Sequence, residues 1–177
     1  FITDLNDNGF LLLRMIIASI CGVFIGFERS RRQKDAGIRT HMIVALGAAL
    51  AMIVSKYGFF DLLQYEGLRA DASRIASNVI TGVGFLGAGS IIVTGNKVRG
   101  ITTAAGLWAS ACMGLAIGAG FYEGALVCFI ISIFANLIFP KIEYWFSKND
   151  AHTMVYIELS ETASVNHVYD VLRASDF

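Results

Sequence analysis

Long apolar runs alternate with short polar segments along this chain, and the runs have the length of membrane-spanning helices. They occupy residues 10–27, 41–57, 75–93, 101–119 and 124–139. Because a helix rises about 1.5 Å per residue, the third run would reach roughly 28 Å, about the thickness of a bilayer core. We therefore predict an all-α polytopic membrane protein with five transmembrane helices over residues 1–146, and a lipid bilayer as its environment.

The C-terminal residues follow a different pattern. Residues 147–151 are polar and predict a linker. Residues 152–159 alternate like a strand, and Ser164 can cap a following helix. One strand and one helix are too few to bury a core. We expect residues 152–177 to be the truncated start of a small cytoplasmic α+β domain.

The third run has unusually small side chains. Its glycines, Gly82, Gly84, Gly87 and Gly89, leave little bulk to face lipid. Glycine lets helix backbones approach closely, and polar side chains in a bundle find partners on other helices. We predict that this helix lies at the centre of the bundle, shielded from lipid by the other four.

Small residues also recur at every fourth position in two other runs. They are Ala18, Gly22 and Gly26 in the first run, and Gly106, Ser110, Gly114 and Gly118 in the fourth. Residues four apart share one helix face, so each series predicts a flat seam for another helix. We expect the third run to be the partner of the seam in the fourth.

Charge alternates between the loops, although the 14 basic and 14 acidic residues cancel overall. Residues 28–39, 97–99 and 141–148 are basic, whereas residues 4–7, 61–71 and 123 carry the acids of the opposite loops. Cytoplasmic loops carry the excess of Lys and Arg, which predicts an outside N-terminus and a cytoplasmic C-terminus. A hydrophobic content of 55% and a mean hydropathy of +0.61 agree with a membrane protein.

Four local features complete the helix predictions. Thr40 is a suitable N-cap for the second span, and Pro140 is expected to end the fifth. Residues 58–70 interleave large apolar and charged side chains, which predicts an interfacial helix. Arg14 lies one turn inside the first span, where its side chain can snorkel to the headgroups.

The loop after the first span is the most charged segment. Its candidate functional residues are Glu28, Arg29, Arg32, Asp35 and Arg39. Membrane topology alone would explain the basic charge. Contacts with anionic lipid, or an ion-pair network centred on Glu28 that holds the loop against the bundle, remain open alternatives.

A polar ridge enters the third run at helical spacing. Its members are Asp71, Arg74, Asn78, Thr81 and Phe85. In one interpretation Asp71 caps the helix, Arg74 pairs with it or snorkels, and the amide and hydroxyl bond across helices. In the other, the ridge is one wall of an ion or proton pathway, because polar groups at membrane depth are costly and tend to be functional.

Little else in the sequence supports catalysis or cofactor binding. Thr102 and Thr103 can cap the fourth span or face the third. The three cysteines lie in apolar runs and the three histidines share no motif, so we expect no disulfide and no zinc site. Residues 82–87 match GxGxxG, but they lack the preceding strand and the later acidic residue of a dinucleotide site. We expect no catalytic residue, metal site, cofactor or nucleic-acid partner.

Four motifs then occur in order along residues 10–140. They are Phe27-Glu28-Arg29 with Lys34-Asp-Ala-Gly-Ile-Arg-Thr-His41, then Arg74-Ile-Ala, then Thr81-Gly-Val-Gly-Phe-Leu-Gly-Ala-Gly89, and Gly100-Ile-Thr-Thr-Ala-Ala-Gly-Leu-Trp108. Together they resemble the MgtC/SapB family of bacterial inner-membrane proteins. The resemblance implies five spans, an ACT-like cytoplasmic domain in some members, adaptation to low magnesium, survival of some pathogens in macrophages, and restraint of the F-type ATP synthase by the best-known member.

Two functions remain in contention at this point. The chain is either a non-enzymatic regulator that binds a membrane complex or another copy of itself, or a small carrier for magnesium, another cation or protons along the third span. The predicted topology places Glu28 and Asp71 on the order of 25 Å apart, at opposite membrane faces. Two carboxylates that far apart cannot share one metal ion, which favours the regulator.

Overall fold

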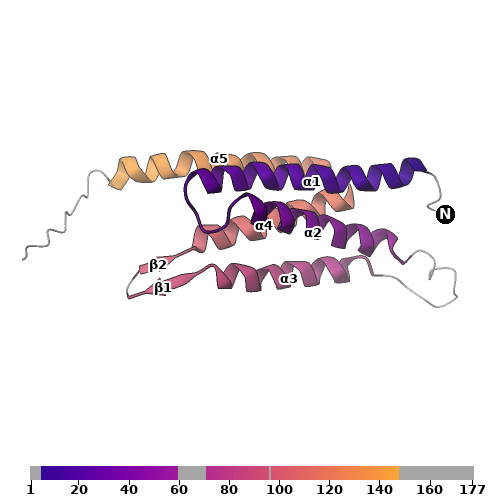
Figure 1. Cartoon of the computed structure of the whole chain (residues 1–177), viewed down its shortest axis with the longest axis horizontal. Coiled ribbons are helices and arrows are strands. Elements are labelled where there is room, and N and C mark those ends of the chain that lie inside the picture. Colours follow the sequence, from indigo (N-terminus) through magenta and orange to yellow (C-terminus); the bar gives the residue numbers. More distant parts are fainter. Residues whose placement is uncertain (1–4, 60–70, 96, 148–177) are drawn as a thin grey trace, which may run out of the picture. The chain divides into compact units, whose positions relative to one another are not determined.

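The structure is a computed structural model that describes residues 5–59, 71–95 and 97–147. Within these ranges the elements are α1 (Leu5–Arg31), α2 (Ile38–Tyr57), α3 (Ser73–Gly89), β1 (Ile92–Thr94), β2 (Lys97–Arg99), α4 (Ile101–Ala119) and α5 (Tyr122–Ser147) (Figure 1). The predicted interfacial helix over residues 58–70 lies almost wholly outside the described residues, and the predicted α+β segment at 152–177 lies entirely outside them.

Four of the described helices are long and apolar enough to cross a membrane. They are α1 from Gly9 onward, α2, α4 and α5, with lengths of 19 to 25 residues. α3 has 17 residues and is not among them. The helical architecture is therefore confirmed, and four of the five predicted spans are long and apolar enough to cross a membrane, whereas the third does not qualify on length.

Small-residue seams on α1 and α4 both pack against α2. A Cβ built on Gly22 of α1 would lie 2.7 Å from the backbone oxygen of His41, and one on Gly118 of α4 would lie 2.5 Å from that of Ala49. Helix backbones in such close contact leave no room for a side chain at the glycine. The partner expected for the α4 seam was α3, and the structure corrects this expectation to α2.

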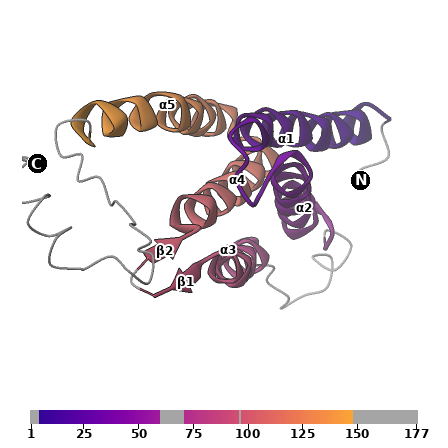
Figure 2. The ribbon, with the colours of Figure 1, turned by 60° about the vertical axis from the view of Figure 1, so that its left-hand side comes forward.

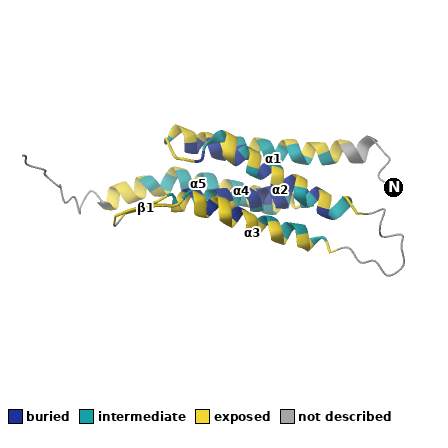
Figure 3. Cartoon of the chain, turned by 60° about the horizontal axis from the view of Figure 1, so that its bottom comes forward, coloured by how far each residue is buried: buried dark blue, intermediate teal, exposed yellow. Residues whose placement is uncertain are grey.

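The expected central position of α3 is also corrected. α4 is the most enclosed helix, with half of its spanning residues buried, and it contacts α1, α2 and α3 (Figures 2 and 3). α3 buries only Val83 and Gly87, against α2 and α4. Around Gly82, Gly84 and Gly89, a built Cβ would meet no atom within 4 Å in the described structure. Glycine therefore permits close packing on α3, but only Gly87 has a neighbour to pack against.

The end of α3 differs from the prediction as well. The helix stops at Gly89, and residues that the apolar pattern assigned to the span form the first strand of a β1–β2 hairpin. Gly95 and Gly100 have φ angles of +59° and +90°, a conformation that glycine adopts at little cost. These two glycines let the chain turn sharply between α3 and α4, which the continuous apolar run concealed.

Other boundaries move outward, including those of α1, which runs over Leu5–Arg31 instead of 10–27 and so contains the first residues of the predicted loop. α2 begins at Ile38 rather than after Thr40, and its first amide donates a hydrogen bond of 3.1 Å to the Ser30 hydroxyl. α5 continues through Pro140 to Ser147. Proline removes only one helical hydrogen bond, and membrane helices often tolerate the loss. The packing described here belongs to the unit Phe1–Ile142; a second unit, Glu143–Phe177, begins within the last turns of α5.

Candidate functional site

Two adjacent charged residues, Glu28 and Arg29, are buried at the C-terminal end of α1. Their exposed fractions are 8% and 3%. Gly26 makes this possible, because it brings α1 so close to α2 that its Cβ would lie 2.6 Å from the Ile38 Cα. Charged side chains are almost never this buried unless they are paired. This end of α1 is therefore the leading candidate for a functional site.

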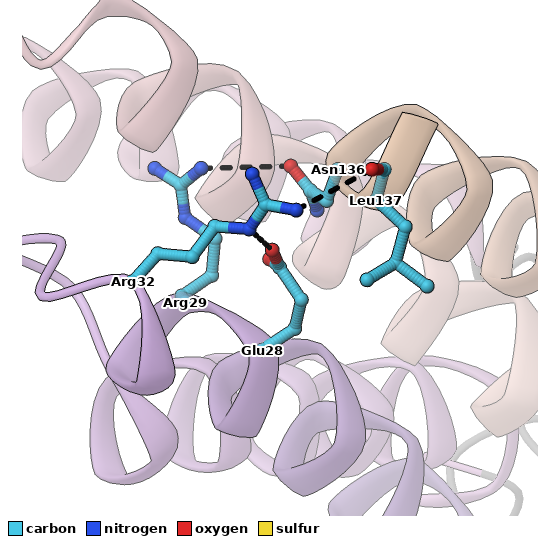
Figure 4. A network of polar contacts seen from close by, with 5 residues as sticks. All are labelled: Glu28, Arg29, Arg32, Asn136 and Leu137. Atoms are coloured by element: carbon cyan, nitrogen blue, oxygen red, sulfur yellow. Dashed lines mark hydrogen bonds and ion pairs between the residues drawn. The ribbon is translucent and has the colours of Figure 1, made fainter. Parts of the chain in front are cut away.

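Glu28 forms an ion pair with Arg32 one helical turn later (Figure 4). Arg32 also donates a hydrogen bond of 3.4 Å to the backbone oxygen of Leu137 on α5. The pair spans positions i and i+4, a spacing that places opposite charges side by side on a helix. Through Arg32, the Glu28 carboxylate helps to hold α1 against α5.

Arg29 connects α1 to α4 and to α5. Its guanidinium donates a short hydrogen bond of 2.7 Å to the Thr103 hydroxyl on α4. A second contact, of 3.5 Å, reaches the side-chain oxygen of Asn136 on α5 and is at the limit of a hydrogen bond (Figure 4). The Thr103 bond is the stronger of the two. Thr103 is 2% exposed and faces α1, not α3 as one sequence alternative proposed.

A second buried polar pair joins α2 to α4. The His41 Nδ1 and the Ser110 hydroxyl lie 2.9 Å apart, and neither residue is exposed. A Cβ on Gly106 would lie 3.3 Å from the His41 ring, so this glycine leaves room for the imidazole. Gly106 and Ser110 are four residues apart on the α4 seam, and they frame His41 from one helix face.

Three polar groups in this region have no hydrogen-bond partner among the described residues. They are the Glu28 carboxylate, the Nε of Arg29 and the Nε2 of His41. The Oε1 of Glu28 is close to Arg32 but is not aligned as a hydrogen-bond acceptor. Unpaired buried polar groups are costly, and in native proteins they tend to mark functional or hydrated sites.

The other candidate residues of the α1–α2 loop and of α4 are exposed. Asp35, Arg39 and Thr102 lie near the same end of the helices but contribute no hydrogen bond or ion pair in the described structure. The structure thus brings Glu28, Arg29, Arg32 and Thr103 together and leaves these three outside the buried cluster.

The α3 ridge lies apart from this cluster. Asp71 is at the far end of the bundle, where the backbone oxygen of Ala72 accepts a hydrogen bond from Ser55 near the end of α2. Hydrogen bonds from the hydroxyl and the amide of Ser73 lower the pKa of Asp71 below its ordinary value. Arg74, Asn78, Thr81 and Phe85 are exposed, and Thr81 donates a hydrogen bond to the backbone oxygen of Ser77 in its own helix.

Glu28 and Asp71 therefore lie at opposite ends of the bundle. Glu28 is near the start of α2, and Asp71 is near its end; the 20 residues of α2 extend about 30 Å. These two acids cannot bind a common ion. Among the described residues, no group of three His, Cys, Asp or Glu side chains could hold a metal ion.

Arg14 occupies a polar site at the end where Asp71 lies. It donates to the Gly118 backbone oxygen at 3.0 Å and to the hydroxyls of Tyr57 and Tyr122 at 3.1 Å. Lys56 donates to the Ala119 backbone oxygen at 2.7 Å. Both cations thus bond the carbonyls at the C-terminus of α4, where the helix dipole favours positive charge.

Sequence reasoning gave no role to His41 and Asn136. A histidine in an apolar helix has no distinctive spacing of its own. The available signal was indirect: Gly106 and Ser110 form a pocket of small residues at four-residue spacing. For Asn136, the signal was an amide in an otherwise apolar run.

Comparison with known proteins finds a family that matches most of the chain. The MgtC family matches residues 15–145. A protein of Escherichia coli K12 named "Putative magnesium transporter YhiD" is 40% identical over 154 residues, which are 87% of this chain and 72% of that protein. No solved structure matches.

Two other relatives share shorter parts of their length. Protein SapB of Bacillus subtilis is 37% identical over 137 residues, which are 77% of this chain and 56% of that protein. Protein MgtC of Salmonella typhimurium is 40% identical over 127 residues, which are 72% of this chain and 51% of that protein.

Proposed function

Because the chain belongs to the MgtC family, a family of multi-pass membrane proteins, we propose that it is a non-enzymatic regulator linked to magnesium limitation and membrane energetics. It acts by binding another membrane complex, with an F-type ATP synthase as the first candidate. The name of one relative, "Putative magnesium transporter YhiD", supports the magnesium connection, and the ATP synthase comes from the resemblance of the motifs.

The observation that carries this proposal is the pairing of the Glu28 carboxylate with an arginine. Its carboxylate pairs with Arg32 and lies beside Arg29, and both arginines bond to other helices. The Arg32 guanidinium neutralises this carboxylate, and Arg29 adds a positive charge on the next residue, which disfavours a divalent cation. Magnesium sites use carboxylates together with retained waters. The charges at this end thus serve to hold helices together, which suits a scaffold that presents a fixed surface to a partner.

The orientation proposed for the bundle follows from its basic end. Arg31, Lys34, Arg39, Lys97 and Arg99 are exposed near the C-terminal end of α1 and the start of α4. The basic end of a membrane protein faces the cytoplasm. We place the protein in the bacterial inner membrane with its N-terminus outside and its C-terminus in the cytoplasm.

A carrier for magnesium, another cation or protons remains the second candidate. The observation that favours it is the burial of Glu28 and His41 with polar atoms that have no hydrogen-bond partner among the described residues, because ionisable groups inside a membrane often belong to ion or proton pathways. The ridge on α3 faces away from the other described helices. A pathway along it would need a second copy or a partner to close it.

One experiment separates the two. The full chain is reconstituted into sealed liposomes, and magnesium and proton fluxes are measured for the wild type, for Glu28→Gln and for Asp71→Asn at the opposite end. The regulator predicts no flux above that of empty liposomes for any of the three. A wild-type flux above that level would establish the carrier instead; its loss in Glu28→Gln alone would locate the path at the buried cluster, and its loss in Asp71→Asn would locate it along the α3 ridge.

The regulatory activity is tested in parallel. ATP-driven proton pumping is measured in inverted membrane vesicles with and without the chain. We expect the wild type to reduce pumping. Unchanged pumping would contradict the ATP synthase as the partner.

A further inference from the structure

The hairpin between α3 and α4 exposes apolar side chains that neither helix covers. Ile92, Val93 and Val98 are 57%, 66% and 52% exposed. Each strand has only three residues, and a hairpin this short is marginal in water on its own. Its exposed apolar surface therefore needs an environment to cover it.

The strand register separates these side chains into two faces. Val93 pairs with Val98, and residues directly opposite each other project to the same side of a hairpin. Neighbours along a strand project to the other side, where Ile92 lies opposite Arg99 and Thr94 lies opposite Lys97. The hairpin thus has a valine face and a second face, here called the basic face, which carries both cations beside Ile92 and Thr94.

The positive charge on the basic face has no ion-pair partner among the described residues. The sequence has no Asp or Glu from residue 72 to residue 122, and neither Lys97 nor Arg99 forms an ion pair in the described structure. An anionic surface would supply the missing counter-charge.

The base of the hairpin is closely packed and held by hydrogen bonds. Gly100 has a φ of +90°, and a Cβ there would overlap the backbone oxygen of Ser90. The Ser90 hydroxyl donates to the Gly87 backbone oxygen at 2.7 Å, and the Ile91 amide donates to that of Ala88 at 3.1 Å. The hairpin therefore begins directly at the end of α3 and ends directly before α4. α4 begins directly after the hairpin, and its 19 residues extend about 28 Å, enough to cross a membrane, so the hairpin lies at a membrane boundary.

From this geometry we propose that the hairpin is an anionic-phospholipid binding element. Val93 and Val98 insert at the boundary of the acyl chains, and Lys97 and Arg99 bind the phosphates of anionic headgroups. The basic charge selects anionic lipid over a neutral surface. The proposal concerns the lipid around the bundle and does not depend on which membrane complex the protein regulates.

The test is amide hydrogen exchange on the full chain in lipid nanodiscs. Exchange of residues 91–100 is compared between phosphatidylcholine discs and discs that also contain phosphatidylglycerol. We expect about tenfold slower exchange of the hairpin in the anionic discs. Each variant serves as its own reference, because a change in hairpin stability cancels from the ratio between the two lipids.

Two pairs of substitutions locate the effect. In Lys97→Gln/Arg99→Gln the ratio should fall to about one, and Lys97→Glu/Arg99→Glu should reverse the preference. The control, Arg39→Gln/Lys141→Gln, removes two exposed charges from the same end of the bundle and should keep the wild-type ratio.

Three outcomes would overturn the proposal: a wild-type ratio of one, a wild-type ratio in Lys97→Gln/Arg99→Gln, or an equal loss in the control. Rapid hairpin exchange in both lipids would indicate that a protein partner, and not lipid, covers the valine face.

Discussion

Replacing glycine by alanine at two positions separates close helix packing from open helix surface. A Cβ on Gly114 of α4 would overlap the backbone oxygen of Ala45 and lie 3.0 Å from the Ala48 Cβ. A Cβ on Gly84 of α3 would meet no atom within 4 Å in the described structure. The two substitutions are chemically identical and differ only in what surrounds them.

The expected magnitude follows from two opposing effects. Alanine in place of a helical glycine stabilises by roughly 0.5–1 kcal/mol, because the unfolded chain loses freedom. Overpacking costs about 1–3 kcal/mol when the obstructing atoms cannot move aside, and at Gly114 one of them is backbone. Gly84→Ala should therefore raise the free energy of unfolding by roughly 0.5–1 kcal/mol. Gly114→Ala should be less stable than Gly84→Ala by about 1–3 kcal/mol, since the propensity gain is common to both.

The assay is reversible unfolding in mixed micelles of dodecylmaltoside and sodium dodecyl sulfate, followed by far-ultraviolet circular dichroism. The free energy of unfolding is compared between the wild type and the two variants. Equal stability of Gly114→Ala and Gly84→Ala would refute the assignment of α2 as the partner of the α4 seam. A loss of stability in Gly84→Ala would show that α3 is covered, as the sequence had suggested.

The same unfolding assay checks two polar contacts. Thr103→Val removes the acceptor of the 2.7 Å hydrogen bond from buried Arg29 and should lower the free energy of unfolding by about 1.5–3 kcal/mol. Thr102→Val, at the exposed neighbouring position, should change it by less than about 0.5 kcal/mol. Equal effects of the two substitutions would contradict a stabilising Arg29–Thr103 hydrogen bond. Arg14→Met keeps the aliphatic stem but loses the bonds to the Gly118 carbonyl and to two tyrosine hydroxyls, so it should cost about 1–2 kcal/mol, and no change would mean that the side chain only snorkels.

Which helix is central could not be predicted from glycine content. On α3, Gly82 and Gly89 lie two turns apart on one face, and Gly84 and Gly87 lie near the opposite face. The four glycines are thus divided between two sides of the helix, and only Gly87 meets a neighbour. On α4 the spacing of four keeps Gly106, Gly114 and Gly118 on one face, and that face meets α2. Regular spacing was the informative signal, whereas the number of glycines was not.

The candidate site was predictable only in part, because its charged residues are close in sequence whereas their partners are not. The charged loop after the first run suggested a network around Glu28, and the structure places an ion pair and three interhelical bonds there. The partner residues Thr103 and Asn136 are more than seventy positions away in the sequence. No local pattern connects them to Arg29, because the contact exists only once α1, α4 and α5 are packed.

The sequence by itself determined where most of the chain is helical, that most of these helices suit a membrane, and which end of the bundle is basic, because hydropathy and charge act residue by residue. Tertiary structure alone decided that α2 receives both glycine seams, that α3 lies at the edge, and that the apolar run after Gly89 turns into a hairpin. The physical reason is that a small residue permits close approach without specifying a partner. The partner depends on how each helix is rotated, and that is settled by all the contacts of the bundle together.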